Sequence, residues 1–371
     1  MGREEADQPK PAKSADEATR QRTLDRLDEE LIRLLNRRAA AAVERSSGEA
    51  ESSAALLPPR PEGALALERI AKLNSGPLSH AAVHAVYREL ASGWRAIERP
   101  ARVAFLGPAY TYSHLAATHR FGQSVEQIPV GSIAAVFEEV VRGHADFGVV
   151  PVENSTDGRI ADTLDMFTRL RVRICGEVPL AIHHSLLGVC GRGEVVEVQS
   201  KPQALSQCRN WLARHVPGAR LVEVASTVVA AQAAREKPGI AAIAGRQAAA
   251  VYELHVLAEN IEDNPSNVTR FFVIGEVSAP RTGKDKTSIM FEVPHQPGAL
   301  ADAMNIFKRT KLNLTWIESF PIARPEGGYM FFVELDGHET DAKVRRAMRA
   351  LEKKTLQLEV LGSYPRSAIV G

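Results

Sequence analysis

The spacing of apolar residues changes along the chain, and each change marks a different kind of structure. Between residues 20 and 97 apolar side chains recur every three or four positions, as at Leu24, Leu27 and Leu31. That period predicts amphipathic helices on either side of a Ser- and Pro-rich loop, with a shorter helix around residues 65–73. We therefore expect an all-α domain at residues 19–99. A disordered tail is expected before it at residues 1–18, where the sequence is charged and lacks an apolar core.

After Pro100 the pattern becomes one of short strands. Runs rich in Val and Ile alternate with helical stretches, which predicts an α/β domain with mostly parallel strands at residues 101–277. Beyond a linker, the order strand, helix, strand, strand, helix, strand predicts a ferredoxin-like α+β domain at residues 286–364. The expected fold class is therefore multidomain, with all-α, α/β and α+β parts.

Composition narrows the possible partners and compartments. The 371 residues include 46 Lys and Arg against 45 Asp and Glu, a balance that gives no general attraction to nucleic acid or to a membrane. No run approaches the roughly 18 apolar residues that a membrane span needs. Cys175, Cys190 and Cys208 form no C-x-x-C pair, so we expect neither a disulfide framework nor a zinc site, and a cytoplasmic location. The adjacent His183 and His184 should point to opposite faces of a strand, which argues against a shared metal.

Polar residues cluster directly after several predicted strands, where open α/β sheets bind ligands. Each cluster alone is also a plausible helix cap. Together they offer helix N-termini and hydroxyls that could converge on an anionic ligand. The candidate substrate-binding residues in these clusters are Thr111, Ser113, Asn154, Ser155, Thr156, Ser200, Gln203, Gln207, Ser226 and Thr227.

Five segments resemble prephenate dehydratase in this order: GPAYTYSHLAA, GVVPVENSTDGRI, SKPQALSQC, AAIAG and NPSNVTRFFVIG. The resemblance implies a two-lobed α/β domain, like that of a periplasmic binding protein, with the substrate in the cleft between the lobes. The implied reaction converts prephenate to phenylpyruvate, carbon dioxide and water, and it needs neither a cofactor nor a metal. The open alternatives are an arogenate dehydratase, whose substrate has an amino group in place of an oxo group, and a noncatalytic small-molecule sensor.

The same resemblance assigns roles within the segment NVTRFFVIG. Thr269 and Arg270 are expected to face the cleft as catalytic residues, and Phe271 is expected to contact the substrate. Thr269 would donate to or polarise the leaving hydroxyl, and Arg270 would either pair with a carboxylate or order the motif. Tyr110 departs from the family, which commonly has Gly there. Because tyrosine does not readily adopt a positive φ, we expect the loop before Thr111 to be shaped differently.

The segments QPGAL and NLTWIESFP resemble an ACT domain of the kind that follows prephenate dehydratase and senses phenylalanine. The resemblance implies an allosteric site for an aromatic amino acid, with phenylalanine the expected effector. Phe320 replaces the family's usual Arg, which leaves the identity of the effector open. A dimerisation module without a ligand is the alternative. The implied effector residues are Gly298, Ala299, Leu300, Glu318 and Ser319.

The segments LDRLDEELIRLLNRR and ELASGWRAIERP resemble the all-helical chorismate mutases. The resemblance implies that Arg20, Arg38 and Glu98 contact chorismate. Gln21 aligns with the family's first-helix Arg, and the Lys expected after that helix is missing. A domain kept for dimerisation or allosteric contact is therefore the alternative. Helices with so small a core favour a second copy, so we expect a homodimer or a higher homo-oligomer.

Overall fold

A computed structural model describes residues 13–46, 69–70, 72–97, 99–156, 158–322 and 328–371, without the side chains of residues 13–16 and 42–46. The chain forms two compact units, Met1–Glu51 and Ser52–Gly371. The first unit contains helix α1 (Lys13–Ser46). Helix α1 begins at Lys13, so it includes residues 13–18 of the segment that we expected to be a disordered tail; residues 1–12 lie outside the described part. Along α1, Leu24, Leu27 and Leu31 are 55%, 55% and 52% exposed.

Helix α3 (His80–Ala96) belongs to the second unit and packs on the α/β domain. Its Glu89 and Ser92 side chains accept hydrogen bonds from the backbone N–H groups of Gln123 and Ser124, at 2.8 and 3.1 Å. Gly122 has φ +81°, and a Cβ there would lie 2.5 Å from the Ser92 side chain, so this contact requires glycine. The predicted domain at residues 19–99 is thus divided between the two units. Of the predicted short helix, residues 69–70 and 72–73 are helical and the rest is not described.

The first lobe of the α/β domain is built on a mixed sheet in the order β2-β1-β3-β11-β5, with β4 beside β3. Strand β1 is parallel to β2 and β3, but β11 is antiparallel to both of its neighbours. The strands are β1 (Arg102–Leu106), β2 (Glu126–Val130), β3 (Phe147–Asn154), β4 (Gly158–Arg159), β5 (Arg173–Ala181) and β11 (Val268–Gly275). The helices are α4 (Tyr112–Phe121), α5 (Ile133–Val141) and α6 (Ala161–Arg169).

The second lobe has its own sheet, in the order β10-β6-β9-β7-β8. Its parallel pairs are β7–β8 and β7–β9, and β6 is antiparallel to β9 and β10. The strands are β6 (Ser185–Gly188), β7 (Glu197–Ser200), β8 (Arg220–Glu223), β9 (Ile240–Ala244) and β10 (His255–Ala258). The helical elements are η2 (Arg192–Glu194), α7 (Pro202–Gln207), α8 (Arg209–His215), α9 (Thr227–Glu236) and α10 (Gln247–Val251).

The chain crosses between the lobes twice, from β5 to β6 and back from β10 to β11. The return crossing inserts β11 between β3 and β5 in the opposite direction. The prediction of mostly parallel strands holds for β1, β2, β3 and β5 but not for β11, because the direction of β11 is set by the point at which the chain leaves the second lobe. Both crossings pass beside the ends of β5 and β11, so they can position side chains from either lobe.

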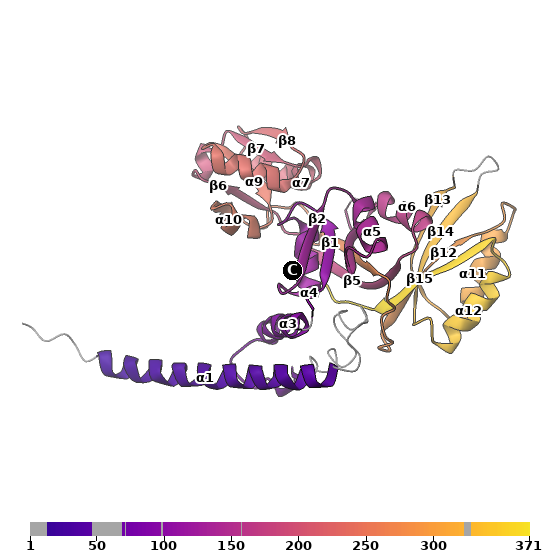
Figure 1. Ribbon diagram of the computed structural model, residues 1–371. Coiled ribbons are helices and arrows are strands. Elements are labelled where there is room, and N and C mark those ends of the chain that lie inside the picture. The colour runs from indigo at the N-terminus through magenta and orange to yellow at the C-terminus, as the bar shows by residue number, and fades with distance from the viewer. Residues whose placement is uncertain (1–12, 47–68, 71, 98, 157, 323–327) are drawn as a thin grey trace, which may run out of the picture. The chain divides into compact units, whose positions relative to one another are not determined.

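The C-terminal domain confirms the predicted strand and helix order. Its sheet has the order β13-β14-β12-β15, and α11 and α12 lie on one face of it (Figure 1). The other face packs on the first lobe, where the ring of Phe272 lies 6.1 Å from Phe332 and 5.8 Å from Tyr364 between centroids. The elements are β12 (Asp285–Glu292), α11 (Ala299–Thr310), β13 (Leu314–Pro321), β14 (Tyr329–Asp336), α12 (Ala342–Glu352) and β15 (Gln357–Pro365).

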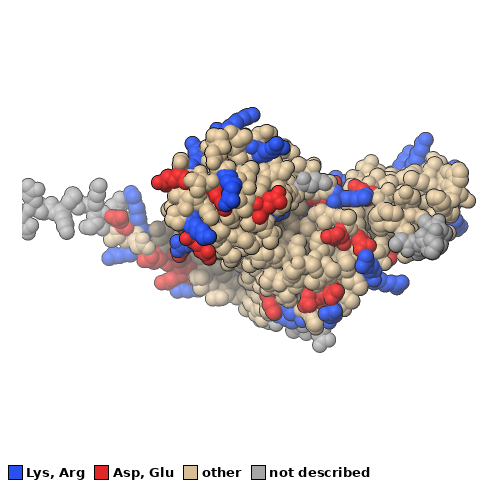
Figure 2. Space-filling model, turned by 90° about the horizontal axis from the view of Figure 1, so that it is seen from above, with Lys and Arg blue, Asp and Glu red and all other residues tan. Residues whose placement is uncertain are grey.

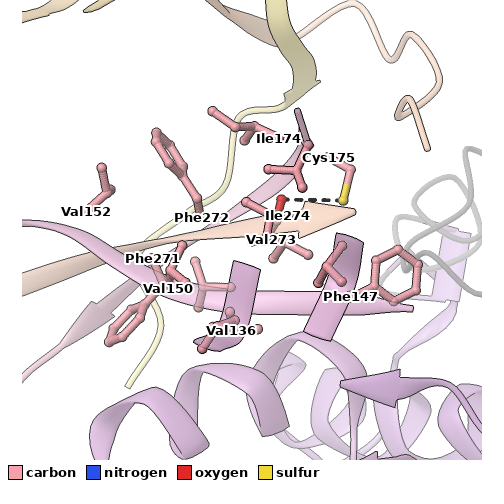
Figure 3. Close-up of a cluster of buried hydrophobic side chains, with 14 of the residues drawn as sticks. Val136, Phe147, Val150, Val152, Ile174, Cys175, Phe271, Phe272, Val273 and Ile274 are labelled. Carbon is pink, nitrogen blue, oxygen red and sulfur yellow. Dashed lines mark hydrogen bonds between the residues drawn. The ribbon is translucent and has the colours of Figure 1, made fainter. Parts of the chain in front are cut away.

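Strand β11 separates two environments in the first lobe. Figure 3 shows Phe271 and Phe272 pointing to opposite faces of β11, as alternation along a strand requires. Both are fully buried.

On the face drawn in Figure 2, acidic and basic side chains are interspersed, in keeping with the balanced net charge. No helix in the described ranges is long and apolar enough to cross a membrane.

Candidate functional site

The site is built around a side-chain contact between neighbouring strands. Thr269 on β11 is paired directly with Asn154 on β3, so the two side chains share one face of the sheet. The amide nitrogen of Asn154 donates to the Thr269 hydroxyl oxygen at 2.8 Å and to the Asn267 amide oxygen at 2.9 Å. Its amide oxygen accepts from the Thr156 backbone N–H at 2.9 Å, which fixes the orientation of the amide. The Thr269 oxygen is thus held as an acceptor, and its hydrogen is available for another partner.

The turn after β3 is fastened to the strand that carries Thr269. The Ser155 hydroxyl accepts from the Val268 N–H at 2.9 Å, and the Ser155 N–H donates to the Val268 carbonyl at 2.9 Å. The Thr156 hydroxyl donates to the Asn267 amide oxygen at 3.4 Å. The predicted residues Asn154, Ser155, Thr156 and Thr269 are therefore brought together by the structure, as the sequence motifs led us to expect.

The hydrogen-bonded chain continues into the second lobe. Asn267, which is 1% exposed, donates through its amide nitrogen to the Gln207 amide oxygen at 3.2 Å. The same oxygen of Gln207 lies 2.9 Å from Nε2 of His184. The Tyr112 hydroxyl lies 3.1 Å from the other ring nitrogen, Nδ1. One continuous chain of polar side chains thus runs from Tyr112 to Thr269 across both crossings between the lobes.

His184 sits neutral at the centre of this chain. Burial lowers its pKa, although the hydrogen bond with Gln207 and the charge of Glu262 act in the opposite direction. Because the Gln207 oxygen can only accept, Nε2 of His184 carries the hydrogen and Nδ1 does not. The Tyr112 hydroxyl, which lies 3.1 Å from Nδ1, also donates to the His183 carbonyl at 2.7 Å. His183 instead bonds to Glu262, at 2.7 Å. The two histidines therefore have different partners, and no group of three His, Cys, Asp or Glu side chains suited to a metal occurs among the described residues.

The lowered pKa of His184 predicts an acid-sensitive fold. The unfolded chain binds the proton more tightly, so this contribution to stability is complete above about pH 6.5 and declines as the pH falls toward the folded pKa. We expect the free energy of unfolding of the wild type to fall more steeply between pH 6.5 and 5 than that of His184→Asn, measured by urea denaturation. Parallel slopes in the two proteins would contradict the assignment.

Several other predicted residues are engaged in local structure. Thr111 caps α4 and donates to the Pro108 carbonyl at 3.0 Å, and Ser226 caps α9 by accepting from Val229 N–H at 3.1 Å. Ser200 is fully buried and donates to the Ile243 carbonyl at 2.7 Å. Ser113, Thr227 and Phe271 are also buried, and Gln203 is half-buried on α7. For Ser200 and Phe271, burial in the lobe cores argues against the predicted contact with substrate.

The expectation about Tyr110 is wrong. Its φ is +68°, so the loop takes the conformation that a glycine would favour, despite the side chain. The Tyr110 N–H donates to Nδ1 of His114 at 3.0 Å, which helps to hold this conformation. Its ring lies 5.3 Å from the His114 ring and 6.4 Å from the Tyr252 ring, edge to face, and Tyr252 belongs to the second lobe. Tyr110 therefore connects the loop before Thr111 to that lobe.

Arg270 does not face the same side as Thr269, contrary to expectation. Its guanidinium is paired with Glu334 of the C-terminal domain, and it lies 3.2 Å from Glu153 and 3.4 Å from Glu177. It also lies 5.3 Å from the centre of the Trp316 ring. Burial lowers its pKa, but these acidic neighbours outweigh burial and raise the pKa overall. The structure therefore favours the ordering role for Arg270 over direct pairing with a substrate carboxylate.

The candidate effector residues lie on two elements of the C-terminal domain. Gly298 precedes α11 with φ +86° and is exposed, Leu300 is 36% exposed, and Ala299 packs into the domain core. Glu318 and Ser319 lie on β13 and contact Arg159 of the first lobe. Among the mutase candidates, Arg20 and Arg38 are exposed on α1, and Glu98 lies outside the residues that the structure describes.

Three residues of the polar chain, Tyr112, His184 and Asn267, were not among the predicted site residues. Asn267 lies two positions before Thr269, and this spacing along a strand already places both on one face. That signal could have identified it. His184 could be found only from its partners Tyr112 and Gln207, which are distant in sequence.

The chain has two α/β lobes that are joined by two crossings, with a chain of polar side chains at the crossings, and a ferredoxin-like domain is attached to the first lobe. These features define the class of two-lobed small-molecule-binding proteins that have a regulatory domain. Residues 103–279 match the family model of prephenate dehydratase, and residues 287–353 match that of the ACT domain. The chain belongs to the prephenate dehydratase family.

Relatives extend the match over the N-terminal helices. The chain is 42% identical to "Bifunctional chorismate mutase/prephenate dehydratase" of Aquifex aeolicus, covering 93% of this chain and 97% of the relative. It is 41% identical to the protein of the same name from Stutzerimonas stutzeri, covering 93% and 96%. A crystal structure of prephenate dehydratase in complex with L-Phe from Arthrobacter aurescens is 34% identical, with a TM-score of 0.67, and covers 71% of this chain and 90% of that one. The predicted family and domain types are confirmed.

Proposed function

We propose that the protein converts prephenate to phenylpyruvate, carbon dioxide and water, and that Thr269 assists departure of the ring hydroxyl. The ring carboxylate leaves as carbon dioxide, and its bonding electrons enter the ring. The carbon–oxygen bond on the opposite side of the ring breaks at the same time, and the departing oxygen takes up a proton to form water. Since the ring becomes aromatic, the protein needs mainly to hold the dianion and to place one hydrogen-bond donor at the hydroxyl.

The observation that supports this role is the hydrogen-bond polarity at Thr269. Asn154 donates to the Thr269 oxygen, so the Thr269 hydrogen must point to another acceptor, and no described protein group accepts it. A donation received from an amide also polarises the hydroxyl and makes it a better donor. Threonine is a weak acid, so we assign it orientation and hydrogen bonding, and solvent supplies the proton that converts the departing hydroxyl to water.

The polar chain to the second lobe supports a role for these residues in placing the substrate. Gln207 and Asn267 fix Asn154, and Asn154 fixes Thr269, without any charged member. A chain of neutral donors can adjust to carboxylates without an uncompensated buried charge in the free protein. Purified protein given prephenate should release phenylpyruvate, and arogenate supplied in parallel tests the rival dehydratase. Binding of either compound without turnover would instead favour the noncatalytic sensor.

We propose L-phenylalanine as the effector of the ACT domain. The related structure bound to L-Phe and the match to the ACT family support this ligand. Phe320, which replaces the family's Arg, packs against the core shared with the first lobe. That position therefore contributes packing where an arginine would contribute charge, and other residues must contact the polar groups of the effector.

We also propose that the protein is a cytoplasmic homodimer with chorismate mutase activity. Arg20 and Arg38 are 18 residues apart on α1, which places them on the same helix face but about 27 Å apart along the axis. One small substrate cannot contact both from a single helix. An antiparallel second copy of α1 would bring its Arg20 near Arg38, and it would cover the half-exposed Leu24, Leu27 and Leu31.

Arg38→Ala tests the mutase proposal. With chorismate as the only substrate, the wild type should consume it well above the uncatalysed rate and accumulate phenylpyruvate, because both reactions occur on one protein. Arg38→Ala should abolish the excess loss while turnover of added prephenate continues. Arg33, which is paired with Glu29 at 3.1 Å, provides the control variant Arg33→Ala on the same helix. Chorismate loss no faster than the uncatalysed rate would leave the helices a structural role.

A further inference from the structure

One ion pair links the turn between β3 and β4, here called the Asn154 turn, to β13, the strand of the ACT domain that contains the candidate effector residues Glu318 and Ser319. Arg159 lies on β4, which pairs with β3 so that Gly158 is opposite Asn154 and Arg159 is opposite Glu153. The Arg159 guanidinium donates through Nη1 to a Glu318 carboxylate oxygen and to the Ser319 carbonyl oxygen, both at 2.8 Å. The side chains of Arg159 and Glu318 are 39% and 25% exposed, so solvent reaches the pair.

The same strand of the ACT domain also contacts the neighbourhood of Thr269. On β13, the Trp316 ring lies over the Arg270 guanidinium, and the Thr315 hydroxyl donates to Glu334 at 2.5 Å. Glu334 is the buried partner of Arg270. Strand β13 therefore contacts two arginines that lie close to the Asn154–Thr269 pair. Arg159 is opposite Glu153, the residue before Asn154, and Arg270 directly follows Thr269. A shift of β13 would act on both at once.

We propose that Arg159 is a positioning residue that couples an amino-acid ligand on the ACT domain to the Asn154 turn. This proposal rests on the proposed function. The ammonium group of a zwitterionic ligand pairs with the Glu318 carboxylate, and the ligand carboxylate pairs with the Arg159 guanidinium. The ligand therefore replaces the direct contact between Arg159 and Glu318. Arg159 then no longer fastens the turn to β13, and the hydrogen bonds that orient Thr269 through Asn154 loosen. Because the pair is partly exposed, it can open without leaving a buried charge unpaired.

Coupling of this kind is reciprocal. If L-phenylalanine weakens the Asn154 turn, then a substrate that orders the turn must weaken L-phenylalanine binding by the same factor. Coupling free energies between sites commonly correspond to about 5- to 150-fold changes in affinity. Removing Arg159 should abolish most of this mutual effect, and it also removes one contact with the ligand carboxylate, so L-phenylalanine binding must be measured beside turnover.

The test compares full-length wild type with Arg159→Met, which keeps the aliphatic stem, and Arg159→Lys, which keeps the charge. Prephenate turnover is measured with and without L-phenylalanine, and calorimetry measures L-phenylalanine binding. We expect the change in kcat/KM caused by L-phenylalanine to be at least fivefold smaller in Arg159→Met, and partly restored in Arg159→Lys. Arg142, paired with Glu138 at 2.9 Å on α5, gives the control variant Arg142→Met, which should respond like the wild type. An undiminished response in Arg159→Met overturns the coupling.

Hydrogen exchange of the backbone provides a readout that does not depend on turnover. L-phenylalanine should accelerate exchange at residues 153–160 in the wild type, and Arg159→Met should show the faster exchange without ligand. If the wild type fails to convert prephenate, the proposed function is wrong, but these exchange data still decide the coupling. Unchanged exchange at residues 153–160 on addition of L-phenylalanine to the wild type, or no binding of it, overturns the proposal.

Discussion

Thr269→Ala should lower kcat for prephenate dehydration about 100-fold while changing the melting temperature little. A positioned proton donor or hydrogen-bond donor commonly contributes 10²- to 10⁴-fold to a rate, and alanine removes the donor entirely. The cost to stability is smaller, because Asn154 keeps its bond to Asn267 when the Thr269 oxygen is lost. One lost hydrogen bond costs roughly 1 kcal/mol. Phenylpyruvate absorbance measures kcat, and a thermal melt measures stability.

Two further substitutions separate the hydroxyl from the shape of the side chain. Thr269→Ser keeps the oxygen and should retain most of the turnover, whereas Thr269→Val keeps the branched shape without the hydroxyl and should resemble alanine. A Thr269→Ala variant that turns over prephenate at the wild-type rate would show that the hydroxyl is not required. The donor would then have to be sought elsewhere along the polar chain, with Asn154 and Gln207 the next to test.

The sequence predicts the domains better than it predicts their contacts. The order of elements in the ACT domain follows from local periods and turn residues, and the structure confirms it. The pairing of Asn154 with Thr269 depends on β11 running antiparallel beside β3, which follows from the return crossing between the lobes. The period of the strand places Thr269 and Asn267 on one face, but the identity of the opposing strand has no local signal.

Tyr110 and Arg270 illustrate why the remaining features could not be predicted. A bulky residue in the left-handed region is disfavoured by about 1–2 kcal/mol, and propensity alone therefore predicts another loop shape. The observed conformation coincides with bonds and ring contacts to His114 and Tyr252. The acidic partner of Arg270 lies 64 positions away, in another domain. Both residues are governed by tertiary contacts that outweigh local preference.

Arg270→Met should lower the free energy of unfolding by about 3–5 kcal/mol, the usual cost of removing one partner from a buried ion pair. Glu334 is 0% exposed and Glu177 is 2% exposed at their side chains, so both carboxylates would lose a positive neighbour inside the protein. Lys286 remains 3.1 Å from each of them, and it can balance only one charge. Urea denaturation of full-length wild type and full-length Arg270→Met at pH 7 measures the difference in their free energies of unfolding.

The pH dependence identifies Glu334 as the group responsible. Burial raises its pKa, but the charges of Arg270 and Lys286 and its hydrogen bonds lower the pKa overall. In the wild type, its contribution to stability is therefore present above about pH 4.5 and is lost as the pH falls through the folded pKa. Without Arg270 the pKa of Glu334 rises, so at low pH the carboxylate is protonated and the variant no longer contains an uncompensated buried charge. The difference in the free energy of unfolding between wild type and Arg270→Met should therefore become smaller from pH 7 to pH 4.

The double variant Arg270→Met with Glu334→Gln distinguishes the two roles considered for Arg270. If Arg270 orders the strand through Glu334, removal of both charges should restore most of the stability, and kcat should recover with it. If Arg270 instead binds a substrate carboxylate, Arg270→Met should raise KM, and Glu334→Gln should not lower it again. A stability deficit below about 1 kcal/mol, or one that is equal at pH 7 and pH 4, would contradict the ordering role, because the buried carboxylates would then not depend on Arg270.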